Sequence, residues 1–265
     1  MRARIGLSLA GLALAALVVA SCGKKESEEG APAATAQPAA TAQPVDAATA
    51  GSVSGAVKLD GAAPKARKIN MAAEPACASA HPGGATDQEV VASAGGDLAN
   101  VVVYVKEGLG SRTFDTPKES VELDQKGCLY SPHVVALMAG QTLAVKNGDQ
   151  TTHNIHPVPK VNREWNKSQP PGSPDLREAF AREELSIPVK CNVHPWMKSY
   201  IAVFKHPYFA VTGTNGSFDL KNLPPGTYTL EAWHEKYGTT SQSVTIGAKE
   251  SKSVTFTFKA AAAGD

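Results

Sequence analysis

The chain has 265 residues, 42% of them hydrophobic, and its 26 Lys and Arg residues nearly balance 25 Asp and Glu residues, for a formal net charge of +1. This hydrophobic fraction excludes a chain that is disordered throughout, and the length suits one large domain or two small ones. The near-neutral charge gives no electrostatic basis for binding nucleic acid. We therefore expect a folded protein without a nucleic-acid partner.

The first residues have the three regions of a secretory signal: basic residues, the apolar run 7–20, and small residues before Cys22. Residues 19–21 together with Cys22 resemble the lipobox of bacterial lipoproteins, in which the cysteine is acylated and becomes the new N-terminus. The resemblance implies a signal peptide over 1–21 and a lipid anchor on Cys22, in the cell envelope and facing the periplasm or the exterior. Gly23 favours the outer membrane. An ordinary signal peptide that contains a cysteine is the alternative.

The segment 22–50 follows the anchor and contains the repeat PAATAQPAATAQP. Its Ala, Pro, Thr and Gln residues cannot build a hydrophobic core. We expect a disordered tether that holds the folded part away from the lipid headgroups.

From Gly51 onward, hydrophobic residues recur at every second position, which is the period of a β-strand. This alternation occurs in the runs 53–59, 143–145, 201–203, 228–230 and 254–258. Turn signals rich in Gly, Asn and Pro separate the runs, so the sequence predicts an all-β sandwich class. The segment SPDLREAFAREEL, which begins at Ser173, is typical either of a short helix or of a strand leading toward Cys191, and both interpretations stay open.

The C-terminal stretch GSFDLKNLPPGTYTL resembles the second half of a carboxypeptidase regulatory-like (transthyretin-like) β domain. The first half of that pattern resembles residues 53–61 and 98–105. The resemblance implies a β-sandwich formed by 51–116 and 208–260, with a second module over 117–207 inserted into it. A tandem arrangement of two domains is the alternative.

Two segments of the central module carry residues that bind metals. The first is HNIH, residues 153–156, which follows a predicted strand and a turn; the second is CNVHPWM, residues 191–197. Together they resemble the cupredoxins, or blue copper proteins, whose ligand pattern is H-N-x-H followed by C-x2-H-x2-M. The resemblance implies a Greek-key sandwich over 117–207 that holds one type 1 copper.

The implied ligands are His153, Cys191 and His194 in the equatorial plane and Met197 on the axis. Two imidazoles and a thiolate with a weakly bound thioether suit copper in both oxidation states. Zinc accepts Cys and His but has little use for a thioether, so a zinc site or simple packing of these residues is the alternative. We expect the ring of His194 to reach the surface, where a redox partner docks.

The neighbours of the ligands supply a second group of predictions. Asn154 is expected to hydrogen-bond the two ligand segments to each other, and His156 to support the site at most. If Cys22 is lipidated and Cys191 binds metal, Cys77 and Cys128 remain as a pair in an oxidising compartment. A disulfide between them closes a loop of about 50 residues and contributes roughly 4 kcal/mol. Two unpaired buried thiols are the alternative. The remaining histidines are interpreted as structural or as loop residues: His81, His133, His206 and His234.

These features together favour a lipid-anchored copper protein that transfers electrons and is not an enzyme. The sequence lacks the additional histidine motifs of multicopper oxidases. The expected partner is a redox protein, such as a cytochrome or a dehydrogenase. Copper storage or delivery as Cu(I) is one alternative, and a surface binding or adhesion module with a structural metal is another.

Overall fold

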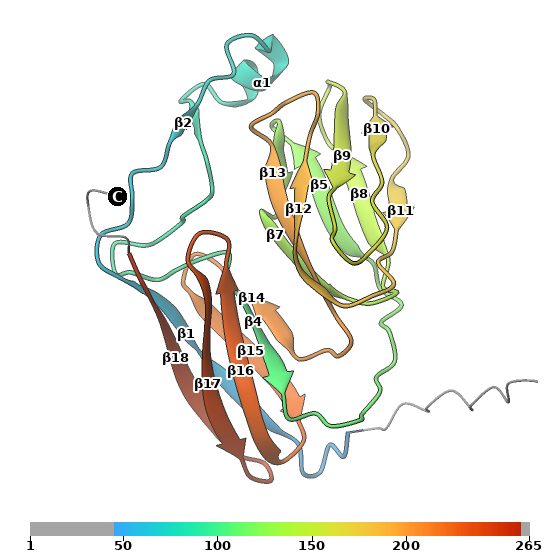
Figure 1. Cartoon of the computed structure of the whole chain (residues 1–265). Coiled ribbons are helices and arrows are strands. Elements are labelled where there is room, and N and C mark those ends of the chain that lie inside the picture. The colour runs from blue at the N-terminus through green and yellow to red at the C-terminus, as the bar shows by residue number, and fades with distance from the viewer. Residues whose placement is uncertain (1–44, 261–265) are drawn as a thin grey trace, which may run out of the picture. The chain divides into compact units, whose positions relative to one another are not determined.

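Nearly all regular elements of the protein are β-strands, as Figure 1 shows for the computed structural model, which describes residues 45–260. The all-β fold predicted from two-residue alternation is therefore confirmed. The predicted signal peptide, the lipidated Cys22 and most of the predicted tether lie outside the described residues. Residues 46–50 depart from that tether prediction, because the backbone N–H groups of Thr49 and Ala50 donate to the Asp46 carbonyl and form a turn.

The first sandwich is built from strands near both ends of the described chain. Its two sheets have the orders β15-β1-β18 and β14-β4-β16-β17. These strands are β1 (Gly51–Asp60), β4 (Val102–Glu107), β14 (Phe209–Val211), β15 (Ser217–Leu223), β16 (Gly226–His234), β17 (Gly238–Ile246) and β18 (Ser251–Lys259). Strands that precede and follow the segment 117–207 thus share the same sheets, and we call this part the outer sandwich.

The outer sandwich is held by a hydrophobic core and by one close backbone approach. Alternate residues of β1, namely Val53, Val57 and Leu59, are buried against Phe256 and other residues of the facing strands. β1 runs parallel to β18, and a Cβ at Gly55 would lie 1.7 Å from the carbonyl oxygen of Val254. Only glycine allows β1 and β18 to pair this closely.

The second sandwich lies between β4 and β14 in the chain, and we call it the inserted sandwich. Its sheets have the orders β10-β9-β12-β13-β7 and β11-β8-β5-β6. These strands are β5 (Val121–Lys126), β6 (Leu129–Ser131), β7 (Val134–Met138), β8 (Leu143–Asn147), β9 (His153–Pro157), β10 (Lys167–Gln169), β11 (Leu176–Glu178), β12 (Glu184–Lys190) and β13 (Lys198–Phe204). The stretch from Ser173 that left helix or strand open contains β11 and the start of β12.

A long connection, residues 61–101, joins β1 to β4. It contains β2 (Lys68–Ile69), the short helix α1 (Pro75–Ala80) and β3 (Ala85–Thr86). Cys77 of α1 is buried and forms a disulfide with Cys128, which lies between β5 and β6. The predicted disulfide is therefore confirmed, and it ties the connection to the inserted sandwich.

The two sandwiches also share a small hydrophobic cluster. Tyr104 of β4 packs against Phe204 of β13 with 4.8 Å between the ring centroids, and Trp233 of β16 is buried in the same cluster. The described residues belong to one compact unit. Within residues 45–260, no helix combines the length and the hydropathy that crossing a membrane requires.

Candidate metal centre

The topology of the inserted sandwich brings the two predicted ligand segments to one edge of one sheet. β9 begins at His153, and β12 ends at Lys190, directly before Cys191. β9 and β12 are antiparallel neighbours in the sheet, so the start of one lies near the end of the other. His153 therefore approaches the loop 191–197 although about 40 residues separate them in the chain.

The loop 191–197 connects β12 to β13 and is closed by its own backbone. The N–H of Met197 donates to the carbonyl of His194 at 2.9 Å, and the N–H of Cys191 donates to the carbonyl of Met197 at 3.4 Å. Cys191, His194 and Met197 are 3%, 0% and 0% exposed. Their spacing of three residues thus turns all three side chains inward from one short loop.

Three of the predicted ligands converge on a common point. The Nδ1 atoms of His153 and His194 are 2.9 Å apart, and the Cys191 Sγ lies 3.9 Å from the His194 Nδ1. One donor atom from each residue falls within 4.8 Å of the others. A single ion bound by two imidazole nitrogens at about 2.0 Å holds those nitrogens roughly 3 to 3.5 Å apart. The donor set therefore fits a metal ion with little movement.

Met197, the fourth predicted ligand, lies at the end of the same loop and is buried. Its side chain is fully buried and belongs to the same hydrophobic cluster as Cys191. A thioether held in apolar surroundings is a weak, soft donor of the kind that copper accepts on its axis.

The surroundings of Cys191 favour its thiolate form. Burial raises the pKa of the thiol. A contact with the His153 imidazole and hydrogen bonds from neighbouring backbone groups lower that pKa by more, so it lies below its ordinary value. One of these backbone groups is the N–H of His194, 3.4 Å from the Cys191 Sγ. The thiolate is the form that binds metals.

Asp149, which the sequence analysis did not single out, orients His153. Its carboxylate accepts hydrogen bonds from the backbone N–H groups of Gly127 and Cys128, both at 2.7 Å, and contacts the Nε2 of His153 at 2.8 Å. Burial lowers the pKa of His153, but Cys191 and Asp149 raise it, and the pKa ends above its usual value. A proton on Nε2 leaves the Nδ1 lone pair directed toward Cys191 and His194. In the sequence, the only sign of this role is that Asp149 lies four residues before His153.

Asn154 connects the two ligand segments, in the way predicted for it. Its Oδ1 accepts the backbone N–H of Asn192 at 2.5 Å, and its Nδ2 donates to the Oδ1 of Asn166 at 2.6 Å. His156 is more peripheral, because its ring nitrogens contact Glu164 at 2.6 Å and Asn192 at 3.3 Å. It therefore supports the ligand loop and does not touch a ligand side chain through these contacts.

The expectation that the ring of His194 reaches the surface is wrong, because this ring is fully buried. Its Nε2 lies 4.0 Å from the carboxylate of Glu74, which precedes α1, and the disulfide sulfurs of Cys77 and Cys128 lie within 4.8 Å of a ring nitrogen. The ring of Trp196 packs on it at 5.2 Å. The connection 61–101 therefore covers this histidine, a contact that the local spacing of ligands does not reveal.

The remaining histidines take structural positions. The ring of His81 contacts the Gly127 carbonyl at 2.6 Å, and the ring of His133 contacts Glu235. His206 and His234 are buried, and burial lowers the pKa of each to about 4. These four side chains are not among the metal-ligating clusters found within residues 45–260.

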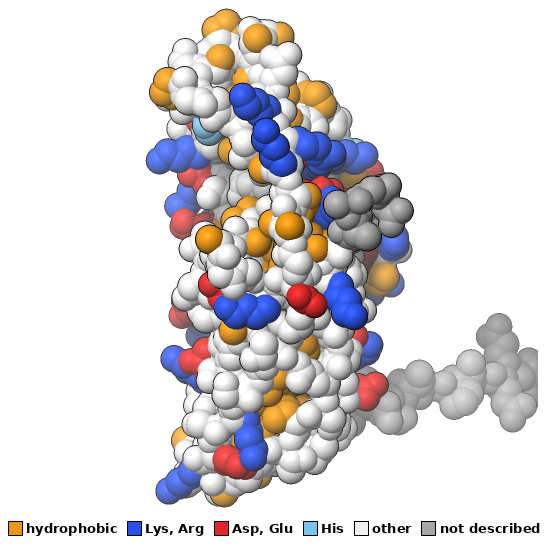
Figure 2. Space-filling view, turned by 90° about the vertical axis from the view of Figure 1, so that its left-hand side faces the viewer, with side chains coloured by type: hydrophobic (Ala, Val, Ile, Leu, Met, Phe, Trp, Pro, Cys, Tyr) orange, Lys and Arg blue, Asp and Glu red, His pale blue; other side chains and the backbone are white. Residues whose placement is uncertain are grey.

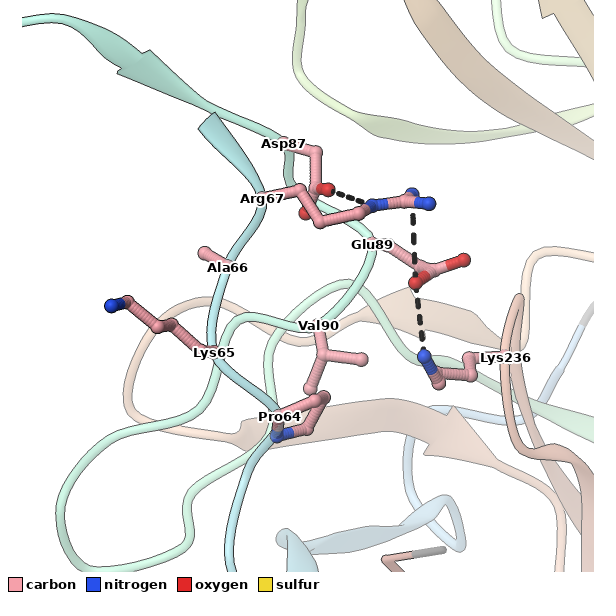
Figure 3. Close-up of a pocket in the computed structure, with 8 residues that line it drawn as sticks. All are labelled: Pro64, Lys65, Ala66, Arg67, Asp87, Glu89, Val90 and Lys236. Carbon is pink, nitrogen blue, oxygen red and sulfur yellow. Dashed lines mark hydrogen bonds and ion pairs between the residues drawn. The ribbon is translucent and has the colours of Figure 1, made fainter. Parts of the chain in front are cut away.

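A charged cavity lies apart from the ligands, and its charges compensate one another. In Figure 3, the Arg67 guanidinium donates to Asp87 at 2.6 Å, and Glu89 lies between Arg67 and Lys236. Lys and Arg side chains are likewise interspersed with Asp and Glu on the face drawn in Figure 2. The cluster around Cys191 is therefore the stronger candidate for the functional site.

One part of the chain matches a known protein family. Residues 200–259 match the family model of the carboxypeptidase regulatory-like domain. No curated protein matches the chain.

Solved structures that are similar include three copper proteins. A copper-containing nitrite reductase from Thermus scotoductus is 19% identical over 37% of this chain, with a TM-score of 0.29, and this chain spans 25% of the reductase. An amicyanin mutant in the Cu(I) form is 17% identical over 38% of this chain and 97% of its own, with a TM-score of 0.29. A purple cupredoxin from Nitrosopumilus maritimus is 19% identical over 31% of this chain and 98% of its own, with a TM-score of 0.27. The chain is thus similar to the carboxypeptidase regulatory-like domain over 200–259, and its structural neighbours are cupredoxins.

Proposed function

We propose that the protein binds one copper ion in a type 1 site and transfers single electrons. The residues that would hold the ion are His153, Cys191, His194 and Met197. The observation that carries this proposal is the convergence of two imidazole nitrogens and one thiol within 4.8 Å of one another in a buried position. When bound, copper supplies a one-electron couple.

The chain contributes a preformed and dry donor set. Because thiolate and thioether favour Cu(I) while imidazole accepts Cu(II), the mixed set serves both oxidation states. The loop 191–197 and the Asn154 bridge hold the donors in place, so little rearrangement accompanies a change of oxidation state. This arrangement suits electron transfer, in which no substrate is transformed.

Electrons would pass to a partner through Trp196, because the ring of His194 is covered. Trp196 is partly exposed, packs on His194 at 5.2 Å, and lines a surface cavity together with Pro195, Lys68 and Lys198. We place the docking position of a redox protein at this surface. In the same proposal, the lipid anchor at Cys22 holds the protein in the cell envelope.

The test is the visible absorption and electron paramagnetic resonance spectrum of the purified protein with one equivalent of Cu(II). An intense thiolate-to-copper band with a narrow hyperfine splitting is expected. A pale spectrum with ordinary splitting would remove the type 1 assignment.

Cys191→Ser is the decisive variant for this site. It should abolish the intense band and leave the free energy of unfolding of the metal-free protein within about 1 kcal/mol, since the smaller serine hydroxyl still offers an acceptor to the N–H of His194. His156→Ala is the matched control and should keep the band, because His156 contacts the loop and not the ligands. A Cys191→Ser protein that keeps the intense band would refute the ligand assignment.

A further inference from the structure

The two nitrogens of the buried His194 ring have different surroundings. Its Nδ1 faces His153 and the Cys191 thiol, as described above. Its Nε2 is buried and makes no hydrogen bond with any described residue. A buried, unpartnered imidazole nitrogen is costly and calls for an explanation, of which a bound ion is one.

A second set of donors lies close to the same ring. One ring nitrogen of His194 and the sulfurs of Cys77 and Cys128 lie within 4.8 Å of one another, and the three residues are 0%, 0% and 1% exposed. The sulfurs are joined as a disulfide, and the segment that brings Cys77 there is the connection 61–101. Breaking that bond would therefore release two thiols directly beside an available imidazole nitrogen.

We propose that Cys77, Cys128 and His194 form a second, redox-gated metal site that binds Cu(I) when the disulfide is reduced. A dithiol reductant would supply two electrons and two protons, breaking the Sγ–Sγ bond and becoming a disulfide itself. The two thiols then lose their protons as the thiolates bind Cu(I). His194 belongs to both groups of donors, so its ring can serve either site.

The chemistry of the donors selects Cu(I) over Zn²⁺. Two thiolates and one imidazole are soft or intermediate donors, and soft thiolates select Cu(I). A structural zinc site closes with four ligands. Glu74 is the nearest further donor, but its carboxylate lies 4.0 Å from the Nε2 and its side chain is 43% exposed.

The connection 61–101 can open locally and give a reductant access to the disulfide. Within the connection 61–101, β2 and β3 have two residues each and pair only with each other, and α1 has six residues. Segments with so little secondary structure open locally at low free-energy cost. The disulfide can therefore be reached without unfolding either sandwich.

The test separates this site from the type 1 site by removing the latter with Cys191→Ser. The variant is reduced with a phosphine, freed of reductant under argon, and titrated with Cu(I) against the chelator bathocuproine disulfonate. We expect the reduced variant to retain one equivalent of Cu(I), with two sulfur neighbours in its X-ray absorption spectrum, and the disulfide form to retain none. Equal retention by both forms, or retention of Zn²⁺ in place of Cu(I), would overturn the proposal.

Two further variants in the Cys191→Ser background keep the result interpretable. Cys77→Ser with Cys128→Ser should bind no Cu(I) under reducing conditions, and circular dichroism checks its fold. His194→Gln, which keeps both cysteines, should bind Cu(I) at least tenfold more weakly. Affinity unchanged by His194→Gln would refute the role of the imidazole. The proposed type 1 site can fail in its own spectrum while this site is still found, because the two share only His194.

Discussion

His234 in the outer sandwich and the pair His153 and His194 in the inserted sandwich are all fully buried, yet their surroundings differ. The ring of His234 packs among aromatic residues, with Tyr237 at 4.9 Å and Phe258 at 6.2 Å, and its Nδ1 accepts the N–H of Lys236 at 3.1 Å. The pair faces a thiol instead. Burial alone therefore does not identify a functional histidine, whereas the convergence of several donor atoms does.

The same contrast holds for buried acids. Glu231 of the outer sandwich has its carboxylate fully occupied by Tyr104 at 2.5 Å, Lys106 at 2.6 Å and Ser241 at 2.8 Å. A satisfied network of this kind stabilises the fold. The carboxylate of Asp149 instead contacts the Nε2 of His153 and orients the ring, which leaves the Nδ1 of His153 available for a metal.

Removing the disulfide tests how strongly the connection 61–101 is held to the inserted sandwich. Of the predicted changes, it should lower the free energy of unfolding most. Cys77→Ser combined with Cys128→Ser should lower the free energy of unfolding by about 4 kcal/mol, because a loop with a sequence separation of 51 residues is no longer closed in the unfolded state. Urea denaturation of the metal-free protein measures this. A loss below about 1 kcal/mol would mean that other contacts hold the connection.

Acidification tests the neutral character of His234. Burial lowers its pKa to about 4, the nearby His133 and Lys236 lower it too, and Glu89 opposes them. Because the unfolded value is about 6.5, the unfolded state binds the proton first as the pH falls. This contribution to stability is complete above pH 6.5, is lost progressively toward pH 4, and has fallen by about 2 kcal/mol at pH 5.

The matched variant for that effect is His234→Gln. Urea denaturation at pH 7 and pH 5 should show a difference between the two pH values that is about 2 kcal/mol smaller than in the parent protein. His206 also has a pKa of about 4, and it contributes equally to both proteins. An unchanged pH dependence would show that His234 is accessible to protons in the folded state.

Asn154→Ala should lower stability less than removing the disulfide does, and it tests the link between the two segments that carry the proposed ligands. The backbone N–H of Asn192 loses its acceptor, which should cost about 1 to 2 kcal/mol in urea denaturation. Copper affinity should fall about tenfold or more, because the two ligand segments are no longer joined. Asn166→Ala is the control, since it leaves the Asn154 to Asn192 bond intact. Equal copper affinity in both variants would contradict the bridging role of Asn154.

The strand content and the candidate ligand residues could be predicted from the sequence. Two-residue alternation dictates strands through side-chain geometry, and the spacing of Cys191, His194 and Met197 places three donors in one tight loop. The pairing of Cys77 with Cys128 followed from assigning roles to the other two cysteines. Each of these features depends on local spacing or on a small number of residues of one type.

The surroundings of the site follow from the folded structure and not from local sequence patterns. The burial of His194 beneath the connection 61–101, and the position of the disulfide beside its ring, depend on contacts between segments more than 50 residues apart. The orientation of His153 by Asp149 also depends on the backbone of Gly127 and Cys128, which fixes that carboxylate. Such contacts leave no periodic signal in the sequence, because long-range packing is set by the whole arrangement of strands and not by neighbouring residues.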